Sequence, residues 1–215
     1  SSDGREAWYL PLRTPDGQHL PADKALPLVK PLLEDPAVEK VGQNLKYDMQ
    51  VFRKAGLSLA GAAFDTMIAA YLLDPSRGNY NLDALAELFL GYQTIKIAEL
   101  IGKGKGQLTL DQVATDRVTD YAAEDAAVAY AVYEQLAPKL EAENLSDLFR
   151  SVEMPLVEVL ADMEYRGVSI DTDRLDRLGK DLAARQEQLS RDIFAHVGRA
   201  FNIDSPKQLG EVLFD

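Results

Sequence analysis

The sequence contains no cysteine and only two histidines, His19 and His196. These absences exclude disulfide bonds, thiolate zinc sites and a cysteine nucleophile, and two isolated imidazoles offer little for histidine chemistry. Any bound metal ion must therefore be held by oxygen atoms. The sequence also lacks an apolar run of about 18 residues and a charged-then-apolar leader. We therefore expect neither a membrane span nor a secretory signal, and we expect a soluble, cytoplasmic protein.

Positive charge is also scarce, because 23 Lys and Arg residues oppose 35 Asp and Glu residues, for a formal net charge of −12. A protein that grips nucleic acid by broad electrostatics needs clustered Lys and Arg to neutralise phosphates, so this balance disfavours such binding. An acidic protein can still act on nucleic acid if its carboxylates hold divalent cations, because the ion reverses the local charge. The charge therefore weakens a DNA-directed function without excluding it.

The hydrophobic pattern divides the chain near residue 150. Before that point it predicts a turn at 1–6 and strands at 7–12 and 38–42. It also predicts helices at 22–33, 64–73, 82–90 and 120–140, and one that follows residue 42 directly and ends at 56. After it, long amphipathic helices dominate, at 151–165 and 172–196. We therefore expect an α/β domain over 1–150 and the root of a different, helical domain over 151–215. The last short helix has nothing to pack against, so we expect the natural chain to continue.

Asn44 and Asp48 lie one turn apart on the helix that follows the second predicted strand, beside its apolar stripe. That stripe consists of Leu45, Met49 and Phe52. The expected solvent face consists of Lys46, Gln50, Arg53 and Lys54. An acid on the inward side of a helix is costly unless it is paired, hydrogen-bonded or bound to a cation. The pattern alone leaves two interpretations of Asp48 open, a cap for a neighbouring loop and a metal ligand.

Asp125 falls near the middle of the apolar face of the helix predicted at 120–140. Tyr121 lies one turn earlier, so its phenol and the carboxylate should point the same way. Six alanines between Ala122 and Ala131 leave room for a ligand to approach closely. The alternative is an alanine-rich core helix with one buried, hydrogen-bonded acid. With Asp48, these residues suggest an oxygen-only centre for Mg²⁺ or Mn²⁺, the ions that assist attack of water on a phosphodiester.

Five segments, in order and spacing, resemble the proofreading 3′→5′ exonuclease domain of family A DNA polymerases. They are VGQNLKYD at 41–48, FDTM at 64–67, LDALAE at 82–87, GKGKGQLT at 102–109 and YAAED at 121–125. Segments at 153–157, 163–171 and 201–209 resemble the start of the polymerase domain of that family. The resemblance implies an α/β, ribonuclease H-like exonuclease fold whose N-terminal strand is missing, followed by a helical segment at the root of the polymerase thumb.

The resemblance also implies roles for five residues around two divalent ions, Mg²⁺ or Mn²⁺. Asp48 matches the second-motif aspartate associated with the second ion. Asp125 matches the third-motif aspartate that ligates the first ion, and Tyr121 matches the tyrosine that orients the attacking water. Gln43 and Asn44 match residues that contact the single-stranded 3′ end of DNA. The expected partners are thus single-stranded 3′ DNA ends and the remainder of the polymerase chain.

The family's first motif, an Asp-x-Glu on the first strand, has no counterpart before Asp48. Asp3 and Glu6 are wrongly spaced, and the only Asp-x-Glu, at 162–164, comes too late in the chain to be the missing pair. We expect the first strand to be cut off or to lie outside this numbering. The 215-residue chain alone should then have little or no exonuclease activity, whereas the parent protein is active. The alternatives are a non-catalytic scaffold or DNA-binding domain and a stand-alone exonuclease acting on RNA.

Overall fold

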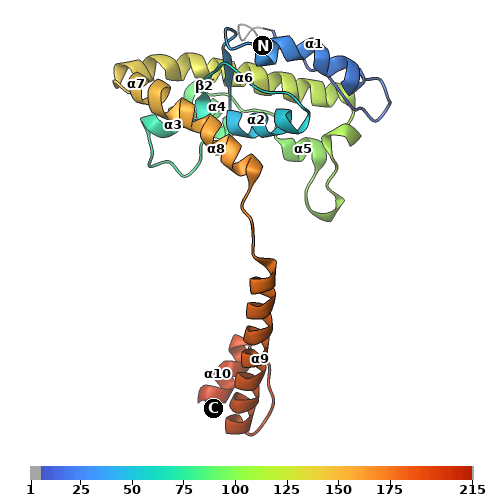
Figure 1. Ribbon diagram of the computed structural model, residues 1–215, viewed down its shortest axis with the longest axis vertical. Helices are drawn as coiled ribbons and strands as arrows, with labels where there is room; N and C mark the ends of the chain where they lie inside the picture. The colour runs from blue at the N-terminus through green and yellow to red at the C-terminus, as the bar shows by residue number, and fades with distance from the viewer. Residues whose placement is uncertain (1–5, 215) are drawn as a thin grey trace. The chain divides into compact units, whose positions relative to one another are not determined.

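The computed structural model describes residues 6–214 and separates into two compact units, Ser1–Arg166 and Gly167–Asp215 (Figure 1). The first unit combines a small parallel sheet with several helices, and the second is helical. The protein is therefore α/β with helices dominant. The turn predicted at residues 1–6 lies almost wholly outside the described residues. Between residues 6 and 214, no helix has both the length and the apolar character needed to cross a bilayer.

The sheet of the first unit pairs β1 (Lys40–Gly42) with β2 (Ala62–Asp65) in parallel, with Val41 opposite Phe64. Parallel strands need a crossover connection, and α2 (Leu45–Lys54) lies within it. The backbone N–H of Lys40 donates to the carbonyl of Gly61 at 2.7 Å, and Gly61 has a φ of +66°. A side chain at Gly61 would meet the carbonyl oxygen of Val38 at 2.5 Å, so only glycine fits this approach to β2.

The strand predicted at 7–12 is not formed, and β1 and β2 are the only strands within residues 6–214. Pro11 cannot donate to a sheet, and the segment has no neighbouring strand to pair with. Trp8 and Leu10 are accordingly 69% and 45% exposed. The prediction failed because a strand needs a partner as well as a pattern.

Helices make up most of the remainder of the first unit. The longer ones are α1 (Ala22–Glu34), α3 (Thr66–Leu73), α4 (Leu82–Leu90), α6 (Thr115–Ala142) and α8 (Met154–Arg166). The shorter ones are α5 (Ile97–Ile101), α7 (Ser146–Leu148), the 3-10 helices η1 (Gly104–Gly106) and η2 (Leu110–Gln112), and the π-helical segment η3 (Phe149–Glu153). The helix predicted at 64–73 begins at Thr66, because Phe64 and Asp65 end β2.

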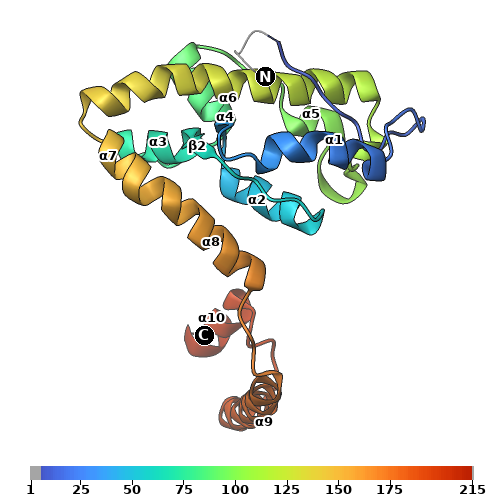
Figure 2. The same ribbon diagram turned by 45° about the horizontal axis from the view of Figure 1, so that its top comes forward.

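The core of the first unit lies between α6 and the elements that pack on it. α3, α4 and β1 all contact α6, which runs along the whole unit in both views (Figures 1 and 2). Leu85, Val132, Leu136 and Phe149 are fully buried there. The ring of Phe64 lies 4.7 Å from that of Phe149, which ties β2 to this cluster. The core thus fixes α6 firmly against the sheet.

The compact unit ends at Arg166, beyond the domain boundary expected near residue 150. α8 remains part of the first unit because Met154, Val157 and Ala161 are buried in its core. The change in sequence texture marks the start of long helices, and the first of these still packs on the α/β core. The assignment of 1–150 and 151–215 to separate functional domains stays a prediction.

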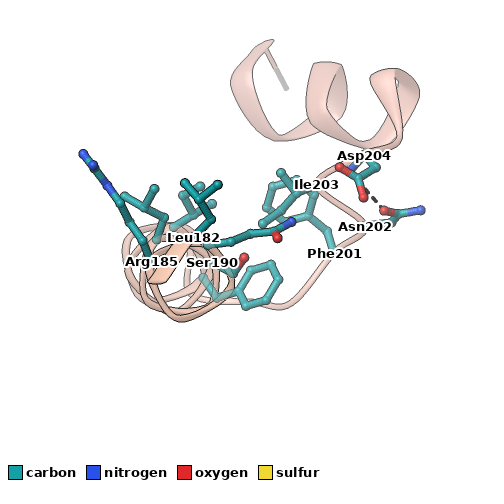
Figure 3. A pocket seen from close by; sticks show the side chains of 11 residues that line it. Leu182, Arg185, Ser190, Phe201, Asn202, Ile203 and Asp204 are labelled. Carbon is teal, nitrogen blue, oxygen red and sulfur yellow. Dashed lines mark hydrogen bonds between the residues drawn. The ribbon is translucent and has the colours of Figure 1, made fainter. Parts of the chain in front are cut away.

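The second unit consists of α9 (Thr172–Val197) and α10 (Pro206–Phe214). The carboxylate of Asp171 caps α9 by accepting a hydrogen bond from the N–H of Arg174 at 2.9 Å. Leu182 of α9 lines a pocket of about 510 Å³ with Phe201 and Ile203 from the following loop (Figure 3). No residue from 167 to 214 is fully buried, so this unit has no closed core of its own.

Candidate functional site

A cleft of about 740 Å³ in the first unit gathers three of the five predicted site residues, Gln43, Asp48 and Asp125. They come from the end of β1, from α2 and from α6. The rest of the lining is largely apolar, from Leu32, Leu33, Val38, Val41, Leu82, Ala126 and Ala129. Tyr121 and Asn44 are absent from the lining, although both adjoin residues of the cleft. Asp48 and Asp125, which are widely separated in sequence, therefore share one hollow, and its lining also includes Glu39.

Asp48 is half-buried on α2, and its carboxylate has no hydrogen bond or ion pair with any described residue. Burial, with a smaller contribution from the negative charge of Asp65, raises the pKa of Asp48 to about 6. Asp48 therefore caps no neighbouring loop, which was one of the two interpretations that the sequence allowed. Its carboxylate is available to a ligand in the cleft.

Asp65 is the fully buried acid of the site. Its Oδ1 accepts hydrogen bonds from the backbone N–H groups of Asn44 (3.1 Å) and Met67 (2.9 Å), and its Oδ2 accepts one from Leu45 (2.7 Å). One carboxylate thus caps α2 and α3 together, where the helix dipoles favour negative charge. Burial raises the pKa of Asp65, while the N–H donors oppose that rise. This role of Asp65 was not predicted from the sequence, although an aspartate just before a helix is a recognised cap signal.

Gln43 and Asn44 form the entrance to α2. The Nε2 of Gln43 donates to the carbonyl of Tyr80 at 2.7 Å, and its Oε1 accepts a hydrogen bond from the hydroxyl of Thr66. Asn44 has a left-handed backbone with a φ of 58°, a conformation that asparagine tolerates better than most residues. Both ends of the Gln43 amide are therefore engaged within the protein, and contact of these residues with DNA stays a prediction.

Tyr121 and Asp125 are linked on α6, as their one-turn spacing predicts. Burial, followed by the charge of Asp125 and its hydrogen bond, raises the pKa of the Tyr121 phenol. Burial also raises the pKa of Asp125, while the hydrogen bond from Tyr121 opposes that rise and the charges of Glu124 and Asp83 add to it. The phenol thus lies close to the carboxylate that lines the cleft.

The neighbouring acids Glu124 and Asp83 already have hydrogen-bond or ion-pair partners. Glu124 accepts hydrogen bonds from the hydroxyl of Tyr92 and the backbone N–H of Ile95, both at 2.7 Å. Asp83 accepts one from the hydroxyl of Thr94 at 2.6 Å and pairs with the ammonium of Lys96 at 2.9 Å. Burial alone would raise the pKa of Asp83, yet these partners hold it below its usual value. These two acids therefore fasten the segment after α4, which leaves Asp48 and Asp125 open to the cleft.

A family model described as 3′-5′ exonuclease matches residues 8–141. This chain belongs to the 3′-5′ exonuclease family of A-type DNA polymerases. It is 43% identical over 195 residues to DNA polymerase I of Rhizobium leguminosarum, covering 91% of this chain and 19% of that protein. It is 41% identical over 218 residues to DNA polymerase I of Pseudomonas aeruginosa, covering 98% and 24%. The chain thus spans about a fifth to a quarter of the length of these relatives.

A solved structure also resembles the chain, the POL domain of Pol1 from M. smegmatis in complex with DNA primer-template and dNTP. The TM-score is 0.71 at 25% sequence identity, and the match covers 92% of this chain and 31% of that one. The matched region therefore extends beyond residues 8–141, the part that the exonuclease family accounts for.

The polar face of α2 in this exonuclease-family chain was predicted to face solvent, and three of its four residues are only partly exposed because they also contact α8. The ammonium of Lys46 lies 2.5 Å from Oε1 of Glu164, the Nε2 of Gln50 donates to Oε2 of Glu164 at 2.6 Å, and Arg53 pairs with Asp162 at 3.2 Å. These partners lie on α8, more than 100 residues further along the chain. Lys54 remains exposed.

The same contacts show the structural role of the only Asp-x-Glu of the chain. Asp162 and Glu164 are held against the outer face of α2 by Arg53, Lys46 and Gln50. They line no part of the cleft. The pair is thus a fastening between two helices, in agreement with its exclusion as the first exonuclease motif.

An exonuclease of this family would use divalent metal ions, and the donor set of the cleft suits them in kind. Asp48 and Asp125 offer carboxylate oxygens, the ligands that Mg²⁺ and Mn²⁺ prefer. Within residues 6–214, no group of three or more His, Cys, Asp or Glu side chains could hold a metal ion. Two carboxylates can anchor one ion together with substrate phosphate, and a second ion requires further ligands.

Proposed function

We propose that the chain forms the greater part of a ribonuclease H-like, metal-dependent 3′→5′ exonuclease domain, which proofreads single-stranded 3′ DNA ends within a larger DNA polymerase. The observation that carries the proposal is the meeting of Asp48 and Asp125, two carboxylates without an ion-pair partner, in one cleft. Burial raises the pKa of both groups, which is typical of sites that bind cations or move protons. DNA bound to the M. smegmatis relative supports DNA as the substrate.

Each of the five predicted site residues has a specific role in this proposal. Asp48 and Asp125 would hold Mg²⁺ or Mn²⁺, which would supply water activation and stabilisation of the leaving 3′ oxygen. Tyr121 orients the attacking water from the turn beside Asp125. Gln43 and Asn44 lie at the start of α2, where they contact the single-stranded 3′ end.

The remaining metal ligands would lie on a strand beside β1. Lys40, Val41 and Gly42 line the cleft, and β1 pairs with β2 on one side only within the described sheet. A further strand carrying an Asp-x-Glu would find free backbone groups there and would bring its acids toward Asp48 and Asp125. The 215 residues contain no such pair before Asp48, so we propose that this polypeptide alone has little activity and that the parent polymerase is active.

Digestion of a labelled oligonucleotide tests the proposal. The 215-residue chain is compared with a longer polypeptide that carries an upstream Asp-x-Glu, each with Mg²⁺, with Mn²⁺ and with EDTA. We expect metal-dependent release of 5′-mononucleotides from single-stranded 3′ DNA by the longer polypeptide only. Asp125→Asn should reduce its rate by roughly 100-fold or more, because a metal ligand is lost.

The matched control is Glu134→Gln, which removes one exposed acid from the same helix and should leave the rate unchanged. Strong digestion by the 215-residue chain would contradict the requirement for further ligands. A longer polypeptide that binds single-stranded DNA without digesting it would instead establish a non-catalytic scaffold. Preference for an RNA strand would identify an RNA-directed exonuclease.

A further inference from the structure

The position of α2 is set from three directions. Its N-terminus is bound by the carboxylate of Asp65 through Asn44 and Leu45. Its inner face is buried in the core through Leu45 and Met49. Its outer face is covered by α8, with which it makes one of the most extensive helix contacts of the first unit. The first two contacts lie within the matched exonuclease region, whereas α8 lies beyond residue 141.

The contact with α8 is a network of charges. Both oxygens of the Glu164 carboxylate are used, one by the ammonium of Lys46 and the other by the amide of Gln50. Asp162 joins Arg53 of α2 to Arg166 of α8, at 3.2 and 2.8 Å. The guanidinium of Arg53 also lies 5.7 Å from the centre of the Tyr165 ring. Isolated surface ion pairs contribute little, but linked pairs with shared partners hold geometry better.

Asp48 lies on the side of α2 that is turned away from this network. An α-helix advances about 100° per residue, so Lys46 and Gln50 each lie roughly 160° around the axis from Asp48. α2 spans only ten residues, Leu45–Lys54, and is uninterrupted, so we treat it as one rigid body. Any roll or tilt at the α8 face is therefore transmitted directly to the carboxylate in the cleft.

We propose that Glu164 and Asp162 are positioning residues for Asp48, so that a helix outside the matched exonuclease region aligns one wall of the exonuclease site. This inference rests on the proposed function, because it assigns Asp48 to the metal-dependent step. It gives α8, which lies beyond residue 141, a part in shaping the exonuclease cleft. Neither acid touches the substrate or the ion.

Charge reversal with reciprocal rescue provides the variants. Glu164→Lys places an ammonium against Lys46, and the double variant Lys46→Glu with Glu164→Lys restores an opposite pair. The amide of Gln50 can still serve the exchanged side chain, because it offers both a donor and an acceptor. The matched control is Glu158→Lys, which makes the same charge change at an exposed position of α8 without an ion-pair partner in the described part of the chain.

Amide hydrogen exchange in the 215-residue chain measures the position of α2 without any enzyme assay. We expect Glu164→Lys to speed exchange in α2 by about three- to tenfold, a local effect of linked surface pairs. The amides of α4, which contacts α6, should not change. The double variant should return α2 to the wild-type rate, and Glu158→Lys should leave it there. Unchanged exchange in Glu164→Lys, or failure of the double variant to restore it, would overturn the proposal.

Kinetics in the longer polypeptide with the upstream Asp-x-Glu then separate positioning from simple support. Glu164→Lys should lower kcat by about tenfold, change KM for single-stranded DNA by less than about twofold, and raise the Mn²⁺ concentration needed for half-maximal rate. The double variant should restore all three. A wild-type polypeptide without nuclease activity would refute the proposed function itself. Wild-type activity that Glu164→Lys leaves unchanged would refute the positioning role alone.

Discussion

The two helices that bring carboxylates to the cleft are held in different ways. α6 is 28 residues long and buries an apolar stripe, which consists of Val118, Val128, Ala129, Val132, Leu136 and Leu140. α2 is ten residues long, buries only Leu45 and Met49, and depends on the Asp65 cap and on charged contacts with α8. Asp125 is therefore placed by hydrophobic packing, whereas Asp48 is placed largely by polar contacts.

The largest expected effect comes from a substitution in the apolar core that holds α6. Leu136 is fully buried in the core, so Leu136→Ala should lower the free energy of unfolding by about 3 kcal/mol through lost burial and a residual cavity. Urea denaturation of the 215-residue chain measures this loss. Leu88→Ala provides the control, since Leu88 is 45% exposed on α4 and should cost less than about 1 kcal/mol. Equal losses in the two variants would contradict packing as the support of α6.

The stability of α2 should depend on its buried cap, Asp65. Asp65→Asn replaces one of two accepting oxygens by an NH₂ group, which cannot accept from the backbone N–H groups of α2 and α3. We expect a loss of about 2 kcal/mol in the free energy of unfolding, with faster amide exchange at the start of α2. Asp23→Asn, at an exposed position in α1, should cost little. Stability close to wild type in Asp65→Asn would remove the cap from the account of α2.

A smaller effect of opposite sign is expected at Asp48. Its pKa in the folded protein is about 6 against an ordinary value of 3.8, so the folded state binds more protons between these values. The stability that this raised pKa contributes is fully present below about pH 3.8 and is lost as the pH rises through about 6. Asp48→Asn should therefore stabilise the chain by about 1 kcal/mol at pH 7.5, after allowance for solvent screening. Unfolding curves at pH 7.5 and near pH 3.5 test this prediction. The gain in free energy of unfolding must vanish near pH 3.5.

The part of the site that sequence could predict is the part built from one helix. Tyr121 and Asp125 lie four residues apart, so helical spacing alone brings phenol and carboxylate together. The bounds of α1, α4 and α9 also followed closely from local patterns of apolar residues and caps.

The remaining features depend on contacts between distant segments. Asp65 serves two helix N-termini at once, and only the tertiary fold brings the second one to it. The face of α2 with Lys46 and Gln50 was assigned to solvent because its charged partner lies on α8. The strand expected at 7–12 has a suitable pattern but no strand to pair with among residues 6–214. Local periodicity reports which face is polar, and it does not report what covers that face.

The most direct test of the central claim is a crystal structure, with anomalous data for Mn²⁺, of a longer polypeptide that carries an upstream Asp-x-Glu. If Asp48 and Asp125 belong to a metal-dependent exonuclease site, Mn²⁺ will lie in the cleft, with carboxylate oxygens of these residues at about 2.1 Å from bound metal. Ordered Mn²⁺ bound elsewhere, with both of these carboxylates free of metal at saturating concentration, would contradict the account.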